Sequence, residues 1–456
     1  MDRSFFREKE VLVMGLGRFG GGLDSAIFAC KSGARVTVTD LADRDCLGEA
    51  LEALKEYDIE YHLGGHVEED FTNSDIIIVN PAVPPANKFI DIALDAGKLV
   101  TSQIEIFFQL TTSRTIGITG SNGKSTTTAL TAHLLRENID EDRNYAAVHL
   151  AGNIGNRPLL AILDDIGEND LVVLEISSFQ GEQLARIESA CDIMVITNLT
   201  PNHLDRHGTF ESYCNAKENL FKYQRLSDND PAVSIFNAED EITSQWFDRY
   251  SKQSGRRCVS FSADDVPESI AAQFKLPGRM NLSNLAAAMA VADQFKISEK
   301  SIAASVAGFE PLPNRLELVV QIDGARWYDD SISTTGDSAI AAFDAFESPI
   351  IIIAGGYDKK LSLDEFAKHI AAKAKAAVLI GQTAEAIART VRENPGKANT
   401  SVRIVSSMAE AVGAAAALSE PGDVVLLSPA CASYDMFDNY RHRSDVFTEC
   451  VRQIKR

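Results

Sequence analysis

The chain has 456 residues, of which 45% are hydrophobic and 24% charged, values typical of globular proteins and not of disordered, collagenous or coiled-coil chains. At roughly 100–200 residues per domain, this length predicts two to four domains. The formal net charge of −21 argues against nucleic acid or an anionic membrane surface as a partner. No apolar run approaches the roughly 18–20 residues that span a bilayer, and the start MDRSFFREKE has no apolar signal region. The odd count of seven cysteines, without a C-x-x-C pair, fits a reducing compartment, so we expect a cytoplasmic protein.

Short β-branched runs alternate with helical patterns along almost the whole chain. Continuous apolar runs between helices are typical of parallel strands in α/β units. Two domain boundaries are predicted, one where a helical patch leads into the polar TTSRT and one in the Pro-containing EPLPNR. They divide the chain into residues 1–102, 103–311 and 312–456. We therefore expect an α/β protein of three domains. The predicted strands cover residues 11–15, 35–40, 75–80, 115–120, 170–177, 191–198, 349–356, 375–381 and 423–428.

A glycine pattern follows the first predicted strand. Gly15, Gly17 and Gly20 form G-x-G-x-x-G, and Asp40 ends the second strand twenty residues later. This spacing matches the fingerprint of dinucleotide-binding domains, in which a diphosphate lies at a helix N-terminus. The pattern alone is weak evidence, and either NAD or a UDP group would suit it.

The segment TIGITGSNGKSTTT (115–128) predicts a phosphate-binding loop between a strand and a helix. Glycines allow backbone N–H groups to close on phosphate oxygens, and the helix N-terminus adds its dipole. Lys124 would contact the β- and γ-phosphates of ATP, and Ser125 would hold Mg²⁺. The spacing departs from the common P-loop, because Ile118 stands where that motif has glycine.

Two later strand ends carry polar residues. Glu175 ends an apolar strand, where a metal carboxylate is expected in such a protein, although a lone Glu there is more often a solvent-facing strand end. His203 and His207 lie four residues apart, but a zinc site would need a third ligand that is not evident. We therefore expect His203 to contact Mg²⁺ or a phosphate, and His207 to be structural.

Five motifs together resemble those of the ATP-dependent Mur ligases, in the order ITGSNGKSTTT, LEISSFQ, TPNHLDRHG, LPGRMNLSN and SPACASYDMF. The resemblance covers nearly the whole chain. It implies a Rossmann-like first domain that binds UDP, a central P-loop ATPase-type domain that binds ATP, and a Rossmann-like third domain that binds the amino acid. The most similar branch adds D-glutamate to UDP-N-acetylmuramoyl-L-alanine through an acyl phosphate, giving ADP and phosphate in peptidoglycan precursor synthesis.

The resemblance also implies roles for individual residues. As catalytic residues and metal ligands it implies Lys124, Ser125, Glu175, His203 and Lys217, the last as a carbamate, with two Mg²⁺ ions. As ATP-binding residues it implies Gly120, Ser121, Asn122, Gly123, Lys124, Ser125, Thr126, Asn284, Arg315 and Asp330. For the UDP-muramoyl substrate it implies Gly17, Arg18, Phe19, Asp40, Asn80, Pro81, Asn153, Ser177 and Gln180. For glutamate it implies Thr334, Lys359, Ser433 and Tyr440.

The amino-acid pocket departs from the family pattern. Ile332 stands where the family has a lysine, and Asn202 replaces an aspartate of some relatives. Ligation of L-glutamate is therefore an alternative, as are a sibling Mur ligase and a folylpolyglutamate synthase. Readings from other classes are an NAD-dependent oxidoreductase built on the first glycine pattern and a nucleotide-binding module without catalysis. We expect a monomer with no nucleic-acid or membrane partner.

Overall fold

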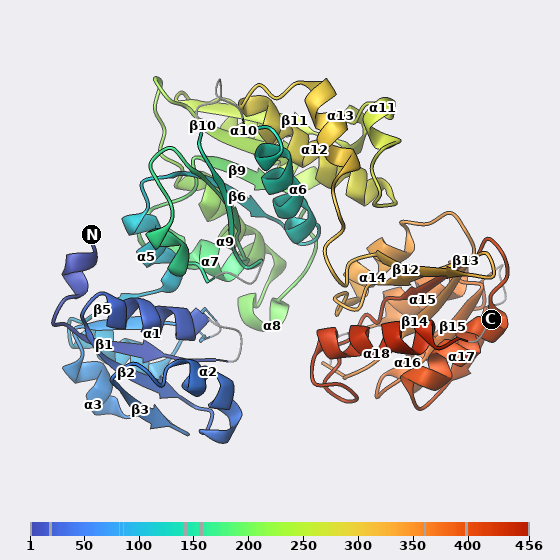
Figure 1. Cartoon of the computed structure of the whole chain (residues 1–456), viewed down its shortest axis with the longest axis horizontal. Helices are drawn as coiled ribbons and strands as arrows, with labels where there is room; N and C mark the ends of the chain where they lie inside the picture. Colours follow the sequence, from blue (N-terminus) through green and yellow to red (C-terminus); the bar gives the residue numbers. More distant parts are fainter. Residues whose placement is uncertain are drawn as a thin grey trace. The chain divides into compact units, whose positions relative to one another are not determined.

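The computed structural model describes residues 2–17, 21–81, 83–84, 86–139, 145–154, 158–359, 362–396 and 400–454. The chain forms two compact units, one of residues 1–265 with 283–305 and the other of residues 266–282 with 306–456. Three β-sheets follow one another along the chain, drawn in blue, green and orange in Figure 1. The first two sheets belong to the first unit and the third to the second unit.

The N-terminal sheet has the strand order β3-β2-β1-β4-β5, and all of its strand pairs are parallel. The chain reverses direction across the sheet between β1 and β4, which is where open α/β sheets bind ligands. Its strands are β1 (Glu10–Met14), β2 (Arg35–Asp40), β3 (Ile59–Leu63), β4 (Ile76–Val79) and β5 (Leu99–Thr101). Its helices are α1 (Gly21–Lys31), α2 (Gly48–Ala53), α3 (Glu68–Asn73) and α4 (Lys88–Asp95).

The central sheet is also parallel, in the order β11-β10-β9-β6-β8-β7. Its strands are β6 (Arg114–Thr119), β7 (Val148–Gly152), β8 (Leu171–Glu175), β9 (Ile193–Ile196), β10 (Ala232–Asn237) and β11 (Arg256–Phe261). The helices along this part of the chain are α5 (Gln103–Leu110), α6 (Lys124–Arg136), α7 (Ser178–Arg186), α8 (Leu204–His207), α9 (Phe210–Lys222) and α10 (Glu241–Tyr250). Three further helices lead to the third sheet, α11 (Glu268–Ala271), α12 (Arg279–Gln294) and α13 (Glu299–Ala307).

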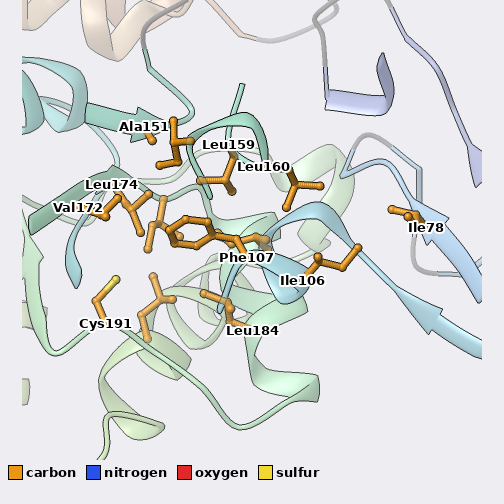
Figure 2. Packing of buried hydrophobic residues seen from close by; sticks show 14 of the residues in the cluster. Ile78, Ile106, Phe107, Ala151, Leu159, Leu160, Val172, Leu174, Leu184 and Cys191 are labelled. Carbon is orange, nitrogen blue, oxygen red and sulfur yellow. The ribbon is translucent and has the colours of Figure 1, made fainter. Parts of the chain in front are cut away.

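One hydrophobic core joins the first two sheets. Helix α5, which follows β5, packs against both α1 and α7. Phe107 of α5 is fully buried and lies beside Leu159 and Leu160, with Leu174 and Leu184 in the same cluster (Figure 2). Burial of each such side chain contributes about 1.5–3 kcal/mol, so this cluster fixes the two sheets against each other. The sites at their edges therefore share one rigid scaffold.

The C-terminal sheet has the order β12-β13-β17-β14-β15-β16, with β12 and β13 antiparallel and the other pairs parallel. Its strands are β12 (Glu317–Ile322), β13 (Ala325–Asp329), β14 (Ile350–Ala354), β15 (Ala376–Leu379), β16 (Ser401–Ile404) and β17 (Val424–Leu427). Its helices are α14 (Gly336–Phe343), α15 (Asp364–Lys373), α16 (Ala384–Glu393), α17 (Met408–Leu418) and α18 (Tyr440–Arg452).

The structure confirms the α/β class, and every strand predicted from the apolar runs is present. Strands β3, β5, β7, β10, β11, β12, β13 and β16 were not predicted. The proposed boundaries at 102/103 and 311/312 fall between sheets, and they remain predictions. Among the helices described, none has the length and apolar character needed to cross a membrane.

Candidate active site

The glycine-rich loop between β6 and α6 has the backbone of a phosphate-binding loop. Gly120 and Gly123 have φ angles of +142° and +81°, which disfavour residues with a side chain. A Cβ at Gly120 would lie 2.0 Å from Thr197 Oγ1, and one at Gly123 would lie 2.2 Å from Asn284 Oδ1. Helix α6 begins at Lys124, and the first N–H groups of a helix have no acceptor within the helix. This loop end can therefore receive an anion.

The side chain of Lys124 folds back over the glycine-rich loop that precedes it. Its Nζ donates to the carbonyl oxygens of Gly120 (3.0 Å) and Ser121 (2.8 Å). These contacts hold the ammonium group at the mouth of the loop, next to the helix N-terminus. The sequence-predicted residues 120–126 are thus brought together as one structural element.

Two residues after β9 hold the loop in place, and sequence reasoning gave them no role. The Asn198 carbonyl accepts from Ser121 N–H and its Oδ1 accepts from Asn122 N–H, both at 2.9 Å. Thr197 Oγ1 donates to the Asn122 carbonyl (2.5 Å). The signal that could have found them is their position directly after a buried strand, at the sheet edge that carries the loop.

Glu175 ends β8, the strand next to β6. Its side chain is buried, with Oε1 accepting from Asn153 Nδ2 at 3.3 Å. Its Oε2 is buried without a hydrogen-bond partner among the residues described. A buried carboxylate oxygen of this kind is costly unless a cation or donor meets it. Glu175 is therefore not a solvent-facing strand end, and Asn153 is held beside it.

Lys217, on α9, is only 1% exposed. Its Nζ donates to Thr119 Oγ1 (3.2 Å), at the end of β6, and lies 4.9 Å from the centre of the Tyr213 ring. Burial lowers the pKa of Lys217 well below its ordinary value, and the Lys124 charge adds to this, while Glu175 opposes it. The neutral amine is therefore strongly favoured relative to a solvated lysine. Tyr213 in turn places its hydroxyl 3.0 Å from Ser121 Oγ.

His203 precedes the short helix α8 and His207 is its last residue, and the two rings differ in environment. His203 is exposed and has a φ of +53°, a conformation uncommon for residues other than glycine. The His207 ring lies 2.9 Å from Ser178 Oγ through Nε2, and its Nδ1 faces Glu182 Oε1 at 3.2 Å. Burial lowers the pKa of His207, so its ring is neutral near pH 7. The structural role predicted for His207 agrees with these contacts.

Three residues predicted to contact a substrate or ATP also make local structural contacts, and their ligand roles remain predictions. Ser177 caps α7 and forms a capping box with Gln180, whose Oε1 accepts from Ser177 N–H at 2.9 Å. Asn284 is buried on α12, and its Oδ1 accepts from Thr127 Oγ1 at 3.2 Å. Asn284 therefore packs beneath the loop at Gly123.

The second predicted site lies where β1 and β4 end. Asp40 Oδ2 accepts from Gly17 N–H (3.1 Å), and Oδ1 accepts from Ala42 N–H (2.8 Å). Asn80 Nδ2 donates to the Gly15 carbonyl (3.1 Å). The structure thus brings Gly17, Asp40 and Asn80 to one sheet edge. Arg18 and Phe19 lie outside the described residues.

The C-terminal unit gathers its predicted residues around three strand ends. Asp330 follows β13 and is buried, with Oδ2 accepting from Ser428 Oγ at 2.7 Å after β17. Burial raises the pKa of Asp330 to about 7. Ser433 is buried, Thr334 and Tyr440 are half-buried, and Lys359 is exposed. Arg315 precedes β12 in the same unit.

Arg443, which the sequence analysis did not select, ties these loops together. It is completely buried on α18, and it donates to the carbonyls of Ser331 (2.8 Å) and Cys431 (3.0 Å). Burial lowers the pKa of Arg443 to about 10, so the guanidinium stays charged at neutral pH. The loop after β13 and the loop after β17 are thereby held together.

Within the described parts of the chain, no three His, Cys, Asp or Glu residues gather as a ready metal cluster. The predicted magnesium ligands contain only two such residues, Glu175 and His203, with a hydroxyl and a modified lysine. The unpartnered Glu175 Oε2 and the buried Lys217 amine fit a site completed by substrate oxygens. Mg²⁺ commonly binds through one or two carboxylates together with phosphates.

Comparison with known proteins agrees with this arrangement. Residues 9–102 match the Mur ligase MurD-like N-terminal domain, residues 118–275 the Mur ligase middle domain, and residues 314–431 the Mur ligase glutamate ligase domain. A UDP-N-acetylmuramoylalanine–D-glutamate ligase of Roseiflexus sp. is 37% identical, over 98% of this chain and 99% of its own. The protein of the same name from Caldanaerobacter subterraneus is 35% identical over 99% of both chains.

Solved structures show the same fold. The UDP-N-acetylmuramate-alanine ligase of Thermotoga maritima aligns with a TM-score of 0.59 at 19% identity, over 98% of this chain and 100% of that one. MurF from Acinetobacter baumannii aligns with a TM-score of 0.57 at 14% identity, over 98% and 93% of the two chains. Since full-length relatives exceed 30% identity and the domain matches follow one another along the chain, this protein belongs to the Mur ligase family, with a MurD-like N-terminal domain.

Proposed function

We propose that this chain is an ATP-dependent ligase that joins D-glutamate to UDP-N-acetylmuramoyl-L-alanine, releasing ADP and phosphate, in peptidoglycan precursor synthesis. The observation that carries the proposal is the meeting of three features at one edge of the central sheet. These are the glycine-rich loop, the unpartnered Glu175 Oε2 and the buried amine of Lys217. The names of the full-length relatives supply the substrates.

In this proposal the loop and the first turn of α6 bind the ATP phosphates, and Lys124 contacts the γ-phosphate. Arg315 and Asp330 would contact the nucleotide from the C-terminal unit. Ser125, Glu175, His203 and Lys217 would hold two Mg²⁺ ions, which neutralise the repulsion between the phosphate and the substrate carboxylate. Lys217 fits this role because its lowered pKa favours the neutral amine, the form that reacts with CO₂ to give a carbamate.

The reaction then has two steps. A carboxylate oxygen of the L-alanyl group attacks the γ-phosphorus, the bond from phosphorus to ADP breaks, and an acyl phosphate forms. The glutamate amine attacks the acyl carbon, the bond from carbon to the phosphate oxygen breaks, and the amine loses a proton. Lys124, fixed at the loop mouth, would stabilise the charge on the transferred phosphoryl group.

The two organic substrates would occupy the other predicted sites. The UDP-muramoyl group would lie along Gly17, Asp40, Asn80 and Pro81 and reach the central sheet near Asn153. Glutamate would meet Thr334 and Ser433 on the two loops that Arg443 ties together, Lys359 after β14, and Tyr440 at the start of α18. Because Ile332 supplies no positive charge, Lys359 would be the main cation for the glutamate carboxylates.

The proposal includes a cytoplasmic monomer. The seven cysteines are free thiols, which fits a reducing compartment. One chain carries the residues proposed for all three substrates, so no second copy is required. Light scattering coupled to size-exclusion chromatography tests this point, and a dimer at micromolar concentration would contradict it.

Phosphate release from ATP tests the proposed reaction, with UDP-N-acetylmuramoyl-L-alanine present and D- or L-glutamate offered separately. We expect release with D-glutamate that stops when any one substrate is omitted. Release with L-glutamate alone would retain the ligase chemistry and overturn the stereochemistry. No release with either enantiomer would refute the assigned reaction.

A further inference from the structure

A turn from the N-terminal sheet forms one wall of the Gly15–Gly17 segment. Val83 N–H donates to the Asn80 carbonyl (2.9 Å), which closes the turn after β4. A Cβ at Gly15 would lie 3.1 Å from Asn80 Cβ and 3.5 Å from Val83 Cγ2. A Cβ at Gly17 would lie 3.3 Å from Asn80 Nδ2. Asn80 Nδ2 also donates to the Gly15 carbonyl (3.1 Å), so displacement of this turn would disturb the glycine segment.

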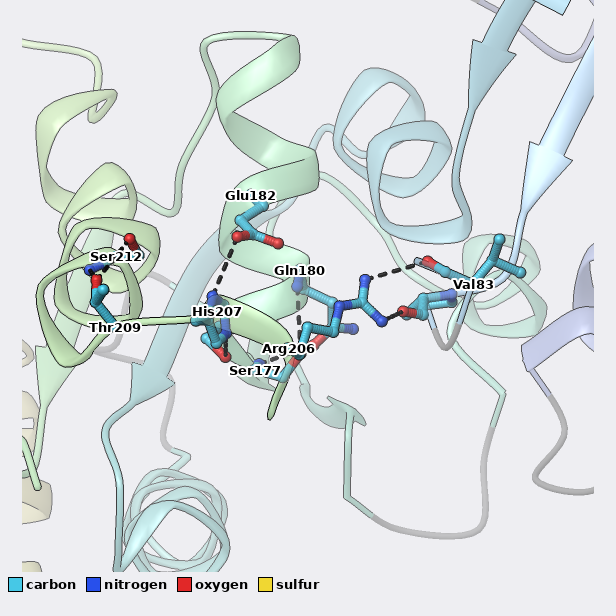
Figure 3. A network of polar contacts seen from close by, with 10 residues as sticks. Val83, Ser177, Gln180, Glu182, Arg206, His207, Thr209 and Ser212 are labelled. Atoms are coloured by element: carbon cyan, nitrogen blue, oxygen red, sulfur yellow. Dashed lines mark hydrogen bonds and ion pairs between the residues drawn. The ribbon is translucent and has the colours of Figure 1, made fainter. Parts of the chain in front are cut away.

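Arg206, on α8 of the central part, holds this turn from outside. Its Nη1 donates to the Pro81 carbonyl (3.0 Å) and its Nη2 donates to the Val83 carbonyl (3.1 Å). Figure 3 shows the guanidinium group extended from α8 toward this turn. The planar guanidinium group of arginine can donate to two acceptors on one loop at once, whereas the ammonium group of a lysine would be a single point charge.

The Arg206 side chain is itself positioned by Phe179. The guanidinium carbon lies 4.1 Å from the centre of the Phe179 ring, within the range of a cation–π interaction. The His207 ring stacks on Phe179 with centres 5.3 Å apart and planes inclined by 25°. Phe179 lies in the first turn of α7, four residues after Glu175. The support for Arg206 thus comes from the proposed metal-binding edge of the central sheet.

The contacts among Ser178, His207 and Glu182 have the spacing of a hydrolytic triad, but burial excludes that role. Ser178 is 2% exposed, and the His207 side chain is 1% exposed. A substrate carbonyl would reach the Ser178 hydroxyl only if this buried cluster opened. Ser178 and Glu182 instead fix the ring of His207 against Phe179.

We propose that Arg206 is a positioning residue that links the turn beside the UDP-muramoyl site to the metal-binding edge of the central sheet. This inference rests on the proposed function, because it takes the Gly15–Gly17 segment as the place where the UDP substrate binds. Arg206 touches neither substrate in this account. It fixes carbonyl groups of the turn, so that the glycine segment and the reacting carboxylate keep a set relative position.

Binding measurements separate this role from a general stabilising one. We would measure the dissociation constants of UDP-N-acetylmuramoyl-L-alanine and of ADP by calorimetry for wild type, Arg206→Met and Arg206→Lys. Loss of two charge-assisted hydrogen bonds should weaken binding of the UDP substrate by about tenfold or more in Arg206→Met. Arg206→Lys, which retains the charge but not the fork, should lie between wild type and Arg206→Met. ADP binding should change by less than about twofold, because the phosphate loop is held by Asn198.

Arg186→Met is the matched control. Arg186 lies at the other end of α7 and donates to both carboxylate oxygens of Glu105, at 3.0 and 2.7 Å. Its loss should lower the thermal midpoint and leave both dissociation constants unchanged. Unchanged binding of the UDP substrate in both Arg206 variants, or equal weakening of UDP substrate and ADP, would overturn the positioning role. Failure of the wild type to bind the UDP substrate would refute the proposed function instead.

A double-mutant cycle tests the pathway through the turn. Asn80→Ala alone removes the other anchor of the turn, its bond to the Gly15 carbonyl. If Arg206 acts through this turn, the double variant should lose less affinity for the UDP substrate than the product of the two single losses. Losses that multiply fully would show that the two residues act independently and would contradict the inference.

Discussion

Replacing Gly123 with alanine would perturb the phosphate loop in two ways that the structure allows to be weighed. The φ angle of +81° costs a residue with a Cβ about 1–2 kcal/mol. The new Cβ would lie 2.2 Å from Asn284 Oδ1, so Asn284 must move and its hydrogen bond with Thr127 is lost, at a cost of about 1 kcal/mol. The total of about 2–3 kcal/mol falls where the ATP phosphates are proposed to bind.

The assay compares Gly123→Ala with Gly97→Ala. Gly97 has a similar φ of +70°, but a Cβ there would meet no heavy atom within 4 Å. Both variants should lower the thermal midpoint by several degrees. Gly123→Ala alone should raise the KM for ATP, by about 30-fold or more if the full cost falls on the binding-competent loop. Equal ATP dependence in the two variants would refute the assignment of this loop to ATP.

Three further predictions follow from buried or paired charges. Lys217→Met should abolish ligation. In metal-free buffer at pH 7 the variant should nevertheless be as stable as wild type, or more stable by about 1–3 kcal/mol in urea unfolding, because the costly burial of an amine is removed. Burial lowers the pKa of Lys217, so between its folded-state and unfolded-state pKa values the unfolded chain binds one more proton than the folded chain. Wild-type stability should therefore rise with pH toward the unfolded-state pKa near 10.4. This rise should be absent in Lys217→Met. Glu175→Gln should keep the wild-type circular dichroism spectrum while phosphate release falls by about 100-fold or more, because a metal carboxylate is lost; release near the wild-type rate would exclude Glu175 from the metal site. The Asp70 carboxylate raises the pKa of His62, so this pair should stabilise the protein by up to about 1 kcal/mol below pH 6. The stabilisation should be lost as pH rises through the folded-state pKa of His62. An equal urea midpoint for wild type and His62→Gln at pH 5.5 would contradict this.

Most of the strands that the sequence predicts are buried on both faces, where apolar residues run without interruption, as in β4 and β9, whereas β2 alternates valine with threonine and is partly exposed. Edge strands such as β3 and β16 are half-exposed, so their composition resembles that of loops. Strand β10 is wholly buried but contains Ser234 and Asn237. These polar side chains are satisfied by Gln224 Oε1 (2.6 Å) and by the Thr197 carbonyl (2.7 Å), which lie outside the strand, 10 and 40 residues away. Local pattern cannot reveal such partners.

The residues of the candidate site also divide into those that the sequence pattern could reveal and those that it could not. Gly123 and Lys124 were identified from the glycine-rich motif between a strand and a helix, and Glu175 from its place at the end of an apolar strand. Parallel strands bring such ends to one edge of the sheet. Asn198 and Arg206 act through backbone carbonyls and N–H groups of other segments, which leave no mark in sequence spacing. The substrate contact expected of Gln180 remains a prediction, and its side-chain oxygen also closes a capping box that the sequence analysis did not foresee. The roles of residues across the two compact units remain predictions.

The central claim is that a substrate carboxylate is activated as an acyl phosphate and then joined to D-glutamate. Both carboxylate oxygens of UDP-N-acetylmuramoyl-L-alanine can be labelled with oxygen-18 before turnover with ATP, Mg²⁺ and D-glutamate. Because one of these oxygens bonds to the γ-phosphorus and leaves with it when the amide forms, mass spectrometry of the released phosphate should show one oxygen-18 atom per phosphate. Phosphate without label, or labelled phosphate without an amide product of the expected mass, would contradict the account.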